Sequence, residues 1–210
     1  MTAKVLKSFS MCVFFVLATI LAAAQDAKPK TLSADFTLTS PKNDKLMTGS
    51  IYFAPPKLRM DMNDLVSKVS AVLIFDYDKN SSVAIMPQFH TYSESLIDSK
   101  SQTLDGRIAV PNFVISDPCV GHPDWKCKKT GIDNLDGRKC DVWDVTNDSD
   151  HVTVWIDQKL HFPIKSKLPD GTSGQYTNIQ EGQPASPALF QIPTGYRKVA
   201  AKASAKVQPK

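Results

Sequence analysis

Residues 49–62 read GSIYFAPPKLRMDM, and this stretch decides the fold. Apolar and polar side chains alternate on both sides of the central Pro-Pro pair, which is typical of two half-buried β-strands joined by a turn. In the second strand, Leu58, Met60 and Met62 share one face, whereas Lys57 and other charged side chains occupy the opposite face. The stretch therefore predicts two neighbouring strands that bury one face against a core.

The same period of two extends over most of the chain. We expect strands at residues 32–39, 46–54, 57–62, 70–77, 82–92, 138–146, 151–157, 162–168 and 173–180. Residues 93–116 break the pattern and fit a short helix or an irregular loop. Because no long helical pattern and no alternating strand–helix units are present, we expect a mainly-β protein whose antiparallel sheet curls into a sandwich, barrel or half-barrel.

The N-terminus has the pattern of an export signal. Lys4 and Lys7 precede an apolar run from Met11 to Ala24, which ends in three alanines and is too short to span a bilayer as a helix. We expect cleavage near Ala24 and a periplasmic or otherwise secreted mature protein. The expected organisation is a signal peptide at 1–24, a polar leader at 25–31, a single β domain at 32–198 and a disordered basic tail at 199–210.

The composition of the 210 residues is that of an ordinary folded protein, with 42% hydrophobic and 22% charged residues. Lysine and arginine number 25 against 21 acidic residues, which gives a formal net charge of +4. This balance argues against a nucleic-acid-binding protein, which would carry a strongly basic domain.

The sequence offers no recognisable catalytic motif. It contains no glycine-rich phosphate loop, no serine nucleophile elbow and no zinc-protease helix motif. We therefore expect no catalytic residues, no cofactor and no metal. If the protein were an enzyme after all, His90 and Asp76 near the central hairpin would be the best candidates.

The densest group of reactive side chains comprises Cys119, His122, Cys127 and Cys140. The spacing fits a Cys3His zinc site, but an exported protein favours a disulfide. The bond could join Cys119 to Cys127 across a short loop, or Cys127 to Cys140 across a turn. We favour Cys119–Cys127, because that loop has few strand formers and gains most from a covalent tie. The thiol of Cys140 would then point into the core.

Apolar side chains on successive strands form a candidate ligand cavity, and the methionines among them would adapt to irregular apolar ligands. The alternative is that these side chains simply fill the core. The candidate residues are Phe36, Leu38, Ile51, Phe53, Leu58, Met60, Met62, Leu73, Phe75, Ile85, Phe89 and Trp143.

Four stretches in this order resemble the strand motifs of periplasmic lipoprotein carriers of the LolA/LolB type. They are GSIYFAPPKLRMDM at 49–62, LIFDYDKNSSVAIMPQFHTYSE at 73–94, VTVWIDQKLHFPIKSKL at 152–168 and YTNIQEGQPASPALFQIPTGYRKV at 176–199. The resemblance implies a strongly curved, half-open antiparallel β-barrel closed on one side by short helices. It also implies an apolar cavity that receives acyl chains.

These observations lead to two hypotheses. In the first, the protein is an exported, monomeric, non-enzymatic binding protein that holds a lipid, a lipoprotein acyl chain or another hydrophobic ligand. In the second, it is a structural or interaction protein of the cell envelope with a collapsed cavity. In that case it would dock on a protein partner through its sheet edge or its basic tail.

Overall fold

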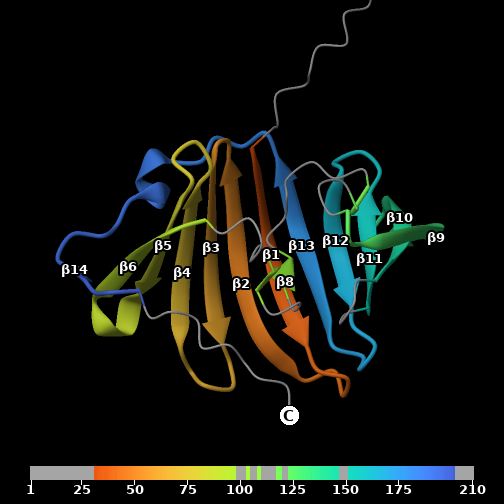
Figure 1. The fold of residues 1–210 in the computed structure, drawn as a ribbon, viewed down its shortest axis with the longest axis horizontal. Coiled ribbons are helices and arrows are strands. Elements are labelled where there is room, and N and C mark those ends of the chain that lie inside the picture. The colour runs from red at the N-terminus through yellow and green to blue at the C-terminus, as the bar shows by residue number, and fades with distance from the viewer. Residues whose placement is uncertain are drawn as a thin grey trace, which may run out of the picture.

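A computed structural model of the chain describes residues 31–97, 103–104, 108–109, 117–119, 123–146 and 151–201. These residues form one twelve-stranded sheet and a separate two-stranded sheet (Figure 1). The order along the large sheet is β14-β6-β5-β4-β3-β2-β1-β13-β12-β11-β10-β9. The edge strands β14 and β9 do not pair with each other, so the sheet is not closed. The expected mainly-β, half-open architecture is therefore confirmed.

Neighbouring strands of the large sheet are antiparallel except β14, which runs parallel to β6. The first half of the chain supplies β1 (Leu32–Thr39), β2 (Lys45–Ala54), β3 (Lys57–Asp64), β4 (Ser70–Asp76), β5 (Ser81–Met86), β6 (Thr91–Leu96), β7 (Thr103–Leu104) and β8 (Ile108–Ala109). The second half supplies β9 (Lys126–Leu135), β10 (Arg138–Thr146), β11 (His151–Asp157), β12 (Phe162–Lys167), β13 (Ser173–Glu181) and β14 (Arg197–Lys198).

Two expectations for this region were wrong. Residues 82–92 do not form a single return strand, and residues 93–96, which we expected in a short helix or loop, belong to β6. Pro87 opens a 3-10 turn, η1 (Pro87–Phe89), and the chain reverses there with His90 in the left-handed region at φ 49°. Strands β5 and β6 then pair with each other as a hairpin. A proline cannot donate to a strand ladder, so a turn is a natural place for it.

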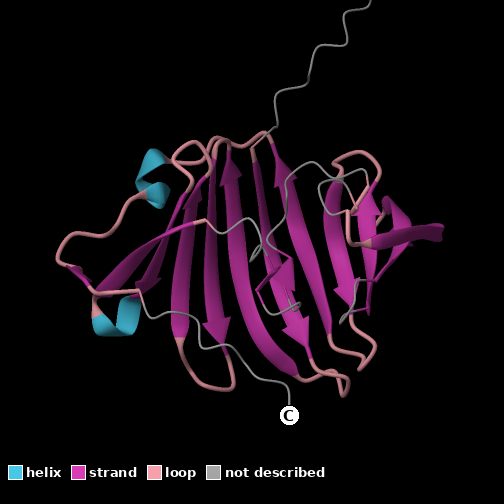
Figure 2. Cartoon of the chain, viewed as in Figure 1, coloured by secondary structure: helices cyan, strands magenta, loops and turns pink. Residues whose placement is uncertain are grey.

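Short helices over the apolar side of the sheet are not seen in the described part of the chain. Its helical elements are η1 and a second 3-10 turn, η2 (Pro187–Phe190) (Figure 2). No helix among the described residues is long and apolar enough to cross a membrane. The expected signal peptide and most of the basic tail lie outside the described residues. Val199, which we assigned to the tail, still donates its backbone N–H to Tyr92 O at 2.8 Å.

The sheet buries a different hydrophobic cluster on each of its faces. The larger cluster lies on what we call the apolar face and contains Leu32, Ala34, Phe36, Ile51, Phe53, Leu58, Met60, Cys140, Phe162, Ile164 and Tyr176. The smaller cluster lies on the second face of β4 and β5 and contains Val72, Ile74 and Ile85. Residues 182–199 leave the centre of the sheet, pass over this second face and end beside β6. Phe190 and Tyr196 of this segment pack against the smaller cluster.

Arg59 of β3 fastens this C-terminal segment to the sheet. Its Nη1 donates to Leu189 O at 2.7 Å, and its Nε donates to Asp61 Oδ1 at 2.8 Å. The Arg59 side chain is only 18% exposed. Alternation alone predicts that Arg59 faces solvent. In the structure, Arg59 instead takes part in packing the C-terminal segment onto the sheet.

Asp157 organises the turn between β11 and β12. Its Oδ1 accepts the backbone N–H groups of Lys159 and Leu160 at 2.7 and 2.9 Å, and its Oδ2 accepts from Arg138 Nη1 at 3.0 Å. Only 3% of the Asp157 side chain is exposed. A buried carboxylate needs such partners, because an unpaired buried charge is strongly destabilising.

Gly49 lies opposite Phe36 on the apolar face. A Cβ at Gly49 would overlap Asp61 O and the Phe36 ring. We expect Gly49→Ala to lower the free energy of unfolding by about 3 kcal/mol or more, at the upper end of the range for overpacked sites, because a backbone atom blocks the methyl group. Urea unfolding of the purified mature protein measures this change.

The matched control is Gly131→Ala on β9, where a Cβ meets nothing within 4 Å. We expect that control to change stability by no more than about 0.5 kcal/mol. Equal stability of the two variants would show that the Phe36 ring does not lie over Gly49 as described.

Candidate functional site

The candidate site is the apolar face where it crosses β1 to β4. Register places Ala34, Ile51, Met60 and Leu73 in one row across these four strands. A second row contains Leu32, Phe53, Leu58 and Phe75. Directly opposed side chains on one face of a sheet pack against each other, so the two rows form a continuous hydrophobic surface.

The centre of this surface is closed, whereas one side of it is accessible. Ile51, Leu58 and Met60 are each 0% exposed. Along β3 and β4 the surface continues into half-buried side chains, and we name this set the half-buried strip: Met62, Leu73, Phe75 and Tyr77. The strip packs against the buried cluster from one side and meets solvent on the other. It is one described part of the apolar face where a hydrophobic molecule could make contact without complete opening of the core. Other side chains that are partly buried against the same cluster are Met47, Leu135, Trp155, Leu160 and Ile179.

The far side of the apolar face is built by strands of the second half of the chain. Tyr176 of β13 lies opposite Phe36 in the register, with ring centroids 6.1 Å apart. Phe162 of β12 lies on the other side of Tyr176 at a centroid distance of 5.1 Å. Both pairs are tilted, which is a favoured geometry for aromatic rings. Phe162, Ile164 and Tyr176 are not among the predicted cavity residues, although the alternation of Phe162 and Ile164 in their strand was a usable signal.

Most of the predicted cavity residues lie on this one face. They are Phe36, Leu38, Ile51, Phe53, Leu58, Met60, Met62, Leu73 and Phe75. Whether they hold a ligand stays a prediction, because no bound molecule tests it.

Ile85, Phe89 and Trp143 are not on the apolar face, which corrects their expected inward orientation. Ile85 pairs with Val72 and belongs to the cluster on the second face. Phe89 lies in η1 and is 64% exposed. Trp143 is three residues after Cys140, whose side chain is in the larger cluster, so the pleat of β10 directs the indole to the opposite side.

Two phenol groups lie among the apolar side chains of this face, in addition to the buried Asp157 carboxylate that is the register partner of Cys140. Tyr77 ends the half-buried strip, and its ring stacks on Phe75 with a centroid distance of 6.4 Å. Burial raises the pKa of Tyr77 to about 12. The Tyr176 hydroxyl is buried without a hydrogen-bond partner, and burial also raises its pKa.

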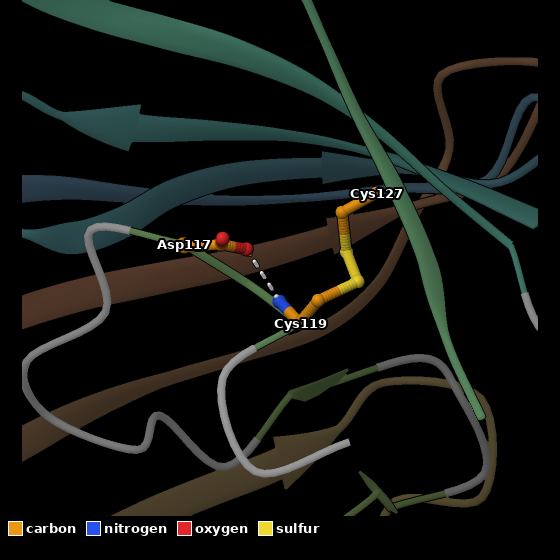
Figure 3. Close-up of a disulfide and its surroundings, with 3 residues drawn as sticks. All are labelled: Asp117, Cys119 and Cys127. Atoms are coloured by element: carbon orange, nitrogen blue, oxygen red, sulfur yellow. Dashed lines mark hydrogen bonds between the residues drawn. A yellow bond between two sulfur atoms is a disulfide. The ribbon is translucent and has the colours of Figure 1, made fainter. Parts of the chain in front are cut away.

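The predicted disulfide between Cys119 and Cys127 is present and joins residues that are eight positions apart (Figure 3). Asp117 Oδ1 accepts the backbone N–H of Cys119 at 2.8 Å. Asp117 and the two sulfur atoms are close enough to suggest a metal site, but both sulfurs are consumed by the disulfide. His122, the remaining member of the zinc alternative, lies outside the described residues.

Cys140 has a free thiol in the core, as expected from this pairing. The side chain is 0% exposed, and its Sγ donates to Arg138 O at 3.4 Å. Burial is the main cause of the raised pKa of this thiol. A protonated, inaccessible thiol is a poor nucleophile, so its role in this structure is packing.

His90 and Asp76 are not brought together. Asp76 ends β4, where it pairs with Lys57 and Lys79 at 3.6 and 3.7 Å. His90 follows the opposite end of β5, a strand that is about 16 Å long at the usual rise per residue. The His90 ring instead lies beside the Tyr196 ring, with a centroid distance of 5.3 Å. The geometry therefore gives no support to this catalytic pair.

No family model matches the sequence, and no curated protein matches it. Among solved structures, an uncharacterised conserved protein from Thermus thermophilus matches with a TM-score of 0.58 and 8% identity, over 82% of this chain and 91% of that chain. At this identity the likeness concerns the fold alone.

Two further solved structures match with lower TM-scores. A LolA superfamily protein from Nitrosomonas europaea matches with a TM-score of 0.37 and 11% identity, over 78% of this chain and 90% of that chain. The MucA/MucB complex of Pseudomonas aeruginosa matches with a TM-score of 0.47 and 16% identity, over 77% of this chain and 55% of that chain. A LolA superfamily protein is thus among the structural matches. At these TM-scores neither structure carries a functional argument.

The cysteine assignment predicts a simple thiol count. We expect mature protein that lacks the signal peptide to react slowly with a thiol reagent when native and to show one thiol, that of Cys140, when denatured. We expect the Cys119→Ser, Cys127→Ser double variant to lose about 2–3 kcal/mol of stability, the amount that model-dependent loop-closure entropy gives for so short a loop. Three thiols in the denatured wild-type protein would contradict the disulfide.

The raised pKa of Tyr77 predicts a loss of stability in alkali. A phenol with a raised pKa favours folding in its neutral form, so its contribution is complete below about pH 10 and is lost as the pH rises through about 12. We expect Tyr77→Phe to reduce the alkaline loss of stability and to remove one late step from the phenolate absorbance titration. The assignment would be refuted if the variant and the wild-type protein gave the same alkaline titration.

Proposed function

We propose that the mature protein is an exported, non-enzymatic binding protein that holds a hydrophobic ligand on its apolar face. The ligand class is a lipid, a lipoprotein acyl chain or a similar apolar molecule. The observation that carries the proposal is the half-buried strip of Met62, Leu73, Phe75 and Tyr77, which extends the buried core to solvent. An accessible apolar surface that is continuous with a core is a typical feature of ligand sites.

The chemistry of the strip supports this proposal. Its members include a methionine and two aromatic rings, and Met47 of β2 is also partly buried against the same cluster. Methionine side chains adopt many shapes at little energetic cost, and aromatic rings offer large apolar contact areas. Such a surface can follow a flexible chain without demanding one fixed ligand shape.

A second candidate function is an envelope protein with a collapsed core, and the burial of the centre favours it. Ile51, Leu58 and Met60 are 0% exposed, so the protein's own side chains and backbone cover the middle of the face. In that case the half-buried strip would be the border of an ordinary core, and the sheet edge would carry the contact with a partner.

Binding of a dansyl-labelled fatty acid to the mature protein separates the two functions. We expect saturable binding by the wild-type protein and about tenfold weaker binding by Leu73→Gln, since the variant loses much of one leucine's apolar contact. The matched control is Leu96→Gln, because Leu96 is 77% exposed and lies on β6 away from the strip. We expect the control to bind as the wild-type protein does.

Native mass spectrometry of detergent-free protein from the cell envelope completes the test. A bound mass that extracts into organic solvent would support the binding protein. The proposal would be overturned by bare protein that also fails to bind the labelled fatty acid, and the collapsed core would then be the better account. Urea unfolding of Leu73→Gln checks that its loss of binding does not reflect loss of the fold.

A further inference from the structure

Tyr176 is the polar exception in the buried cluster of the apolar face. It lies in the middle of β13, opposite Phe36, and is 9% exposed. Its hydroxyl oxygen is fully buried and has no hydrogen-bond partner among the residues that the structure describes. Phe36 and Phe162 contact its ring, and neither side chain can accept a hydrogen bond of ordinary strength.

This hydroxyl is energetically incomplete in the closed core. A buried polar group without a partner destabilises the folded state by about 1–3 kcal/mol. A phenylalanine would provide the same ring contacts with Phe36 and Phe162 without that penalty. Buried polar groups in folded proteins generally have a partner, whereas the Tyr176 hydroxyl and, on the opposite face, Trp143 Nε1 have none among the described residues. Of the two, the Tyr176 hydroxyl is the one on the apolar face.

The surroundings restrict the chemistry of that partner. Tyr176 is flanked by aromatic and aliphatic members of the cluster, and the Cys140 thiol of the same cluster already donates to Arg138 O. A strongly hydrated ion would lose its water in such surroundings, which is unfavourable. The suitable partner is a single oxygen acceptor carried by an otherwise apolar molecule, such as a carbonyl or carboxyl group on an acyl chain.

We propose that Tyr176 is the polar anchor of the apolar face and donates a hydrogen bond to the carbonyl or carboxyl oxygen of an acyl-chain ligand. This inference rests on the proposed binding function and narrows its ligand class. Ligand entry requires the side chains of the closed centre to move, and the hydrogen bond gained by Tyr176 favours the open, occupied state. Pure hydrocarbons would gain apolar contact alone.

Competition against the dansyl-labelled fatty acid tests the anchor with palmitic acid, methyl palmitate and hexadecane. We expect Tyr176→Phe to weaken binding of the oxygen-bearing competitors by about tenfold and to leave hexadecane unchanged. A preference of the wild-type protein for palmitic acid would indicate a free carboxyl group, and a preference for methyl palmitate would indicate an ester lipid. The matched control is Tyr52→Phe, because Tyr52 belongs to the alternate positions of β2 that face away from Ile51 and Phe53. We expect Tyr52→Phe to leave the binding of all three competitors unchanged.

Thermal unfolding of the unliganded variants shows whether Tyr176→Phe retains the fold. We expect its unfolding temperature to equal or exceed that of the wild-type protein, because the unpartnered hydroxyl is removed. Equal effects of the variant on all three competitors, or no effect on any, would overturn the anchor while leaving the binding function in place. Failure of the wild-type protein to bind any of the probes would overturn both.

Discussion

The structure depends on burying the apolar face of its central strands although the sheet never closes. A closed barrel covers its inner face by its own curvature, whereas this sheet ends at the free edges β14 and β9. The larger cluster therefore draws side chains from both halves of the chain, from Phe36 of β1 to Cys140 of β10. The second face needs a separate cover over Val72 and Ile74, which residues 182–199 provide.

Strand positions were predictable from the sequence because the pleat enforces a period of two. Phe36 and its alternate neighbours could occupy one face only if residues 32–39 were extended, and the same reasoning held for the hairpin around Pro55-Pro56. The mistaken strand at 82–92 has a different cause. Apolar and polar side chains alternate from Val83 to Tyr92, but Pro87 and the left-handed backbone of His90 reverse the chain direction. The alternation pattern alone does not reveal such a reversal.

The candidate site was harder to predict than the strands. Alternation assigns side chains to one of two faces within a strand, but register decides which face joins the next strand. Ile85 was expected to face inward with the alternating positions of successive strands, yet the β4–β5 hairpin sets it opposite Val72 on the second face. Tyr176 was missed for the complementary reason: its strand is mostly polar, and only the pairing with Phe36 brings it into the core.

The motifs that resemble the carrier family mark residues with structural duties. Gly49 leaves room for the Phe36 ring, Arg59 holds Leu189 of the C-terminal segment, and Asp157 fixes the turn after β11. Each of these interactions would stabilise any sheet of this shape, whatever ligand the sheet binds. A motif of this kind therefore predicts a fold more strongly than a function. Under the proposed function, ligand choice would depend on the half-buried strip and the Tyr176 hydroxyl, which lie within the same stretches of sequence. A packed core gains nothing from an orphaned hydroxyl, whereas a site that discriminates among apolar molecules gains selectivity from it.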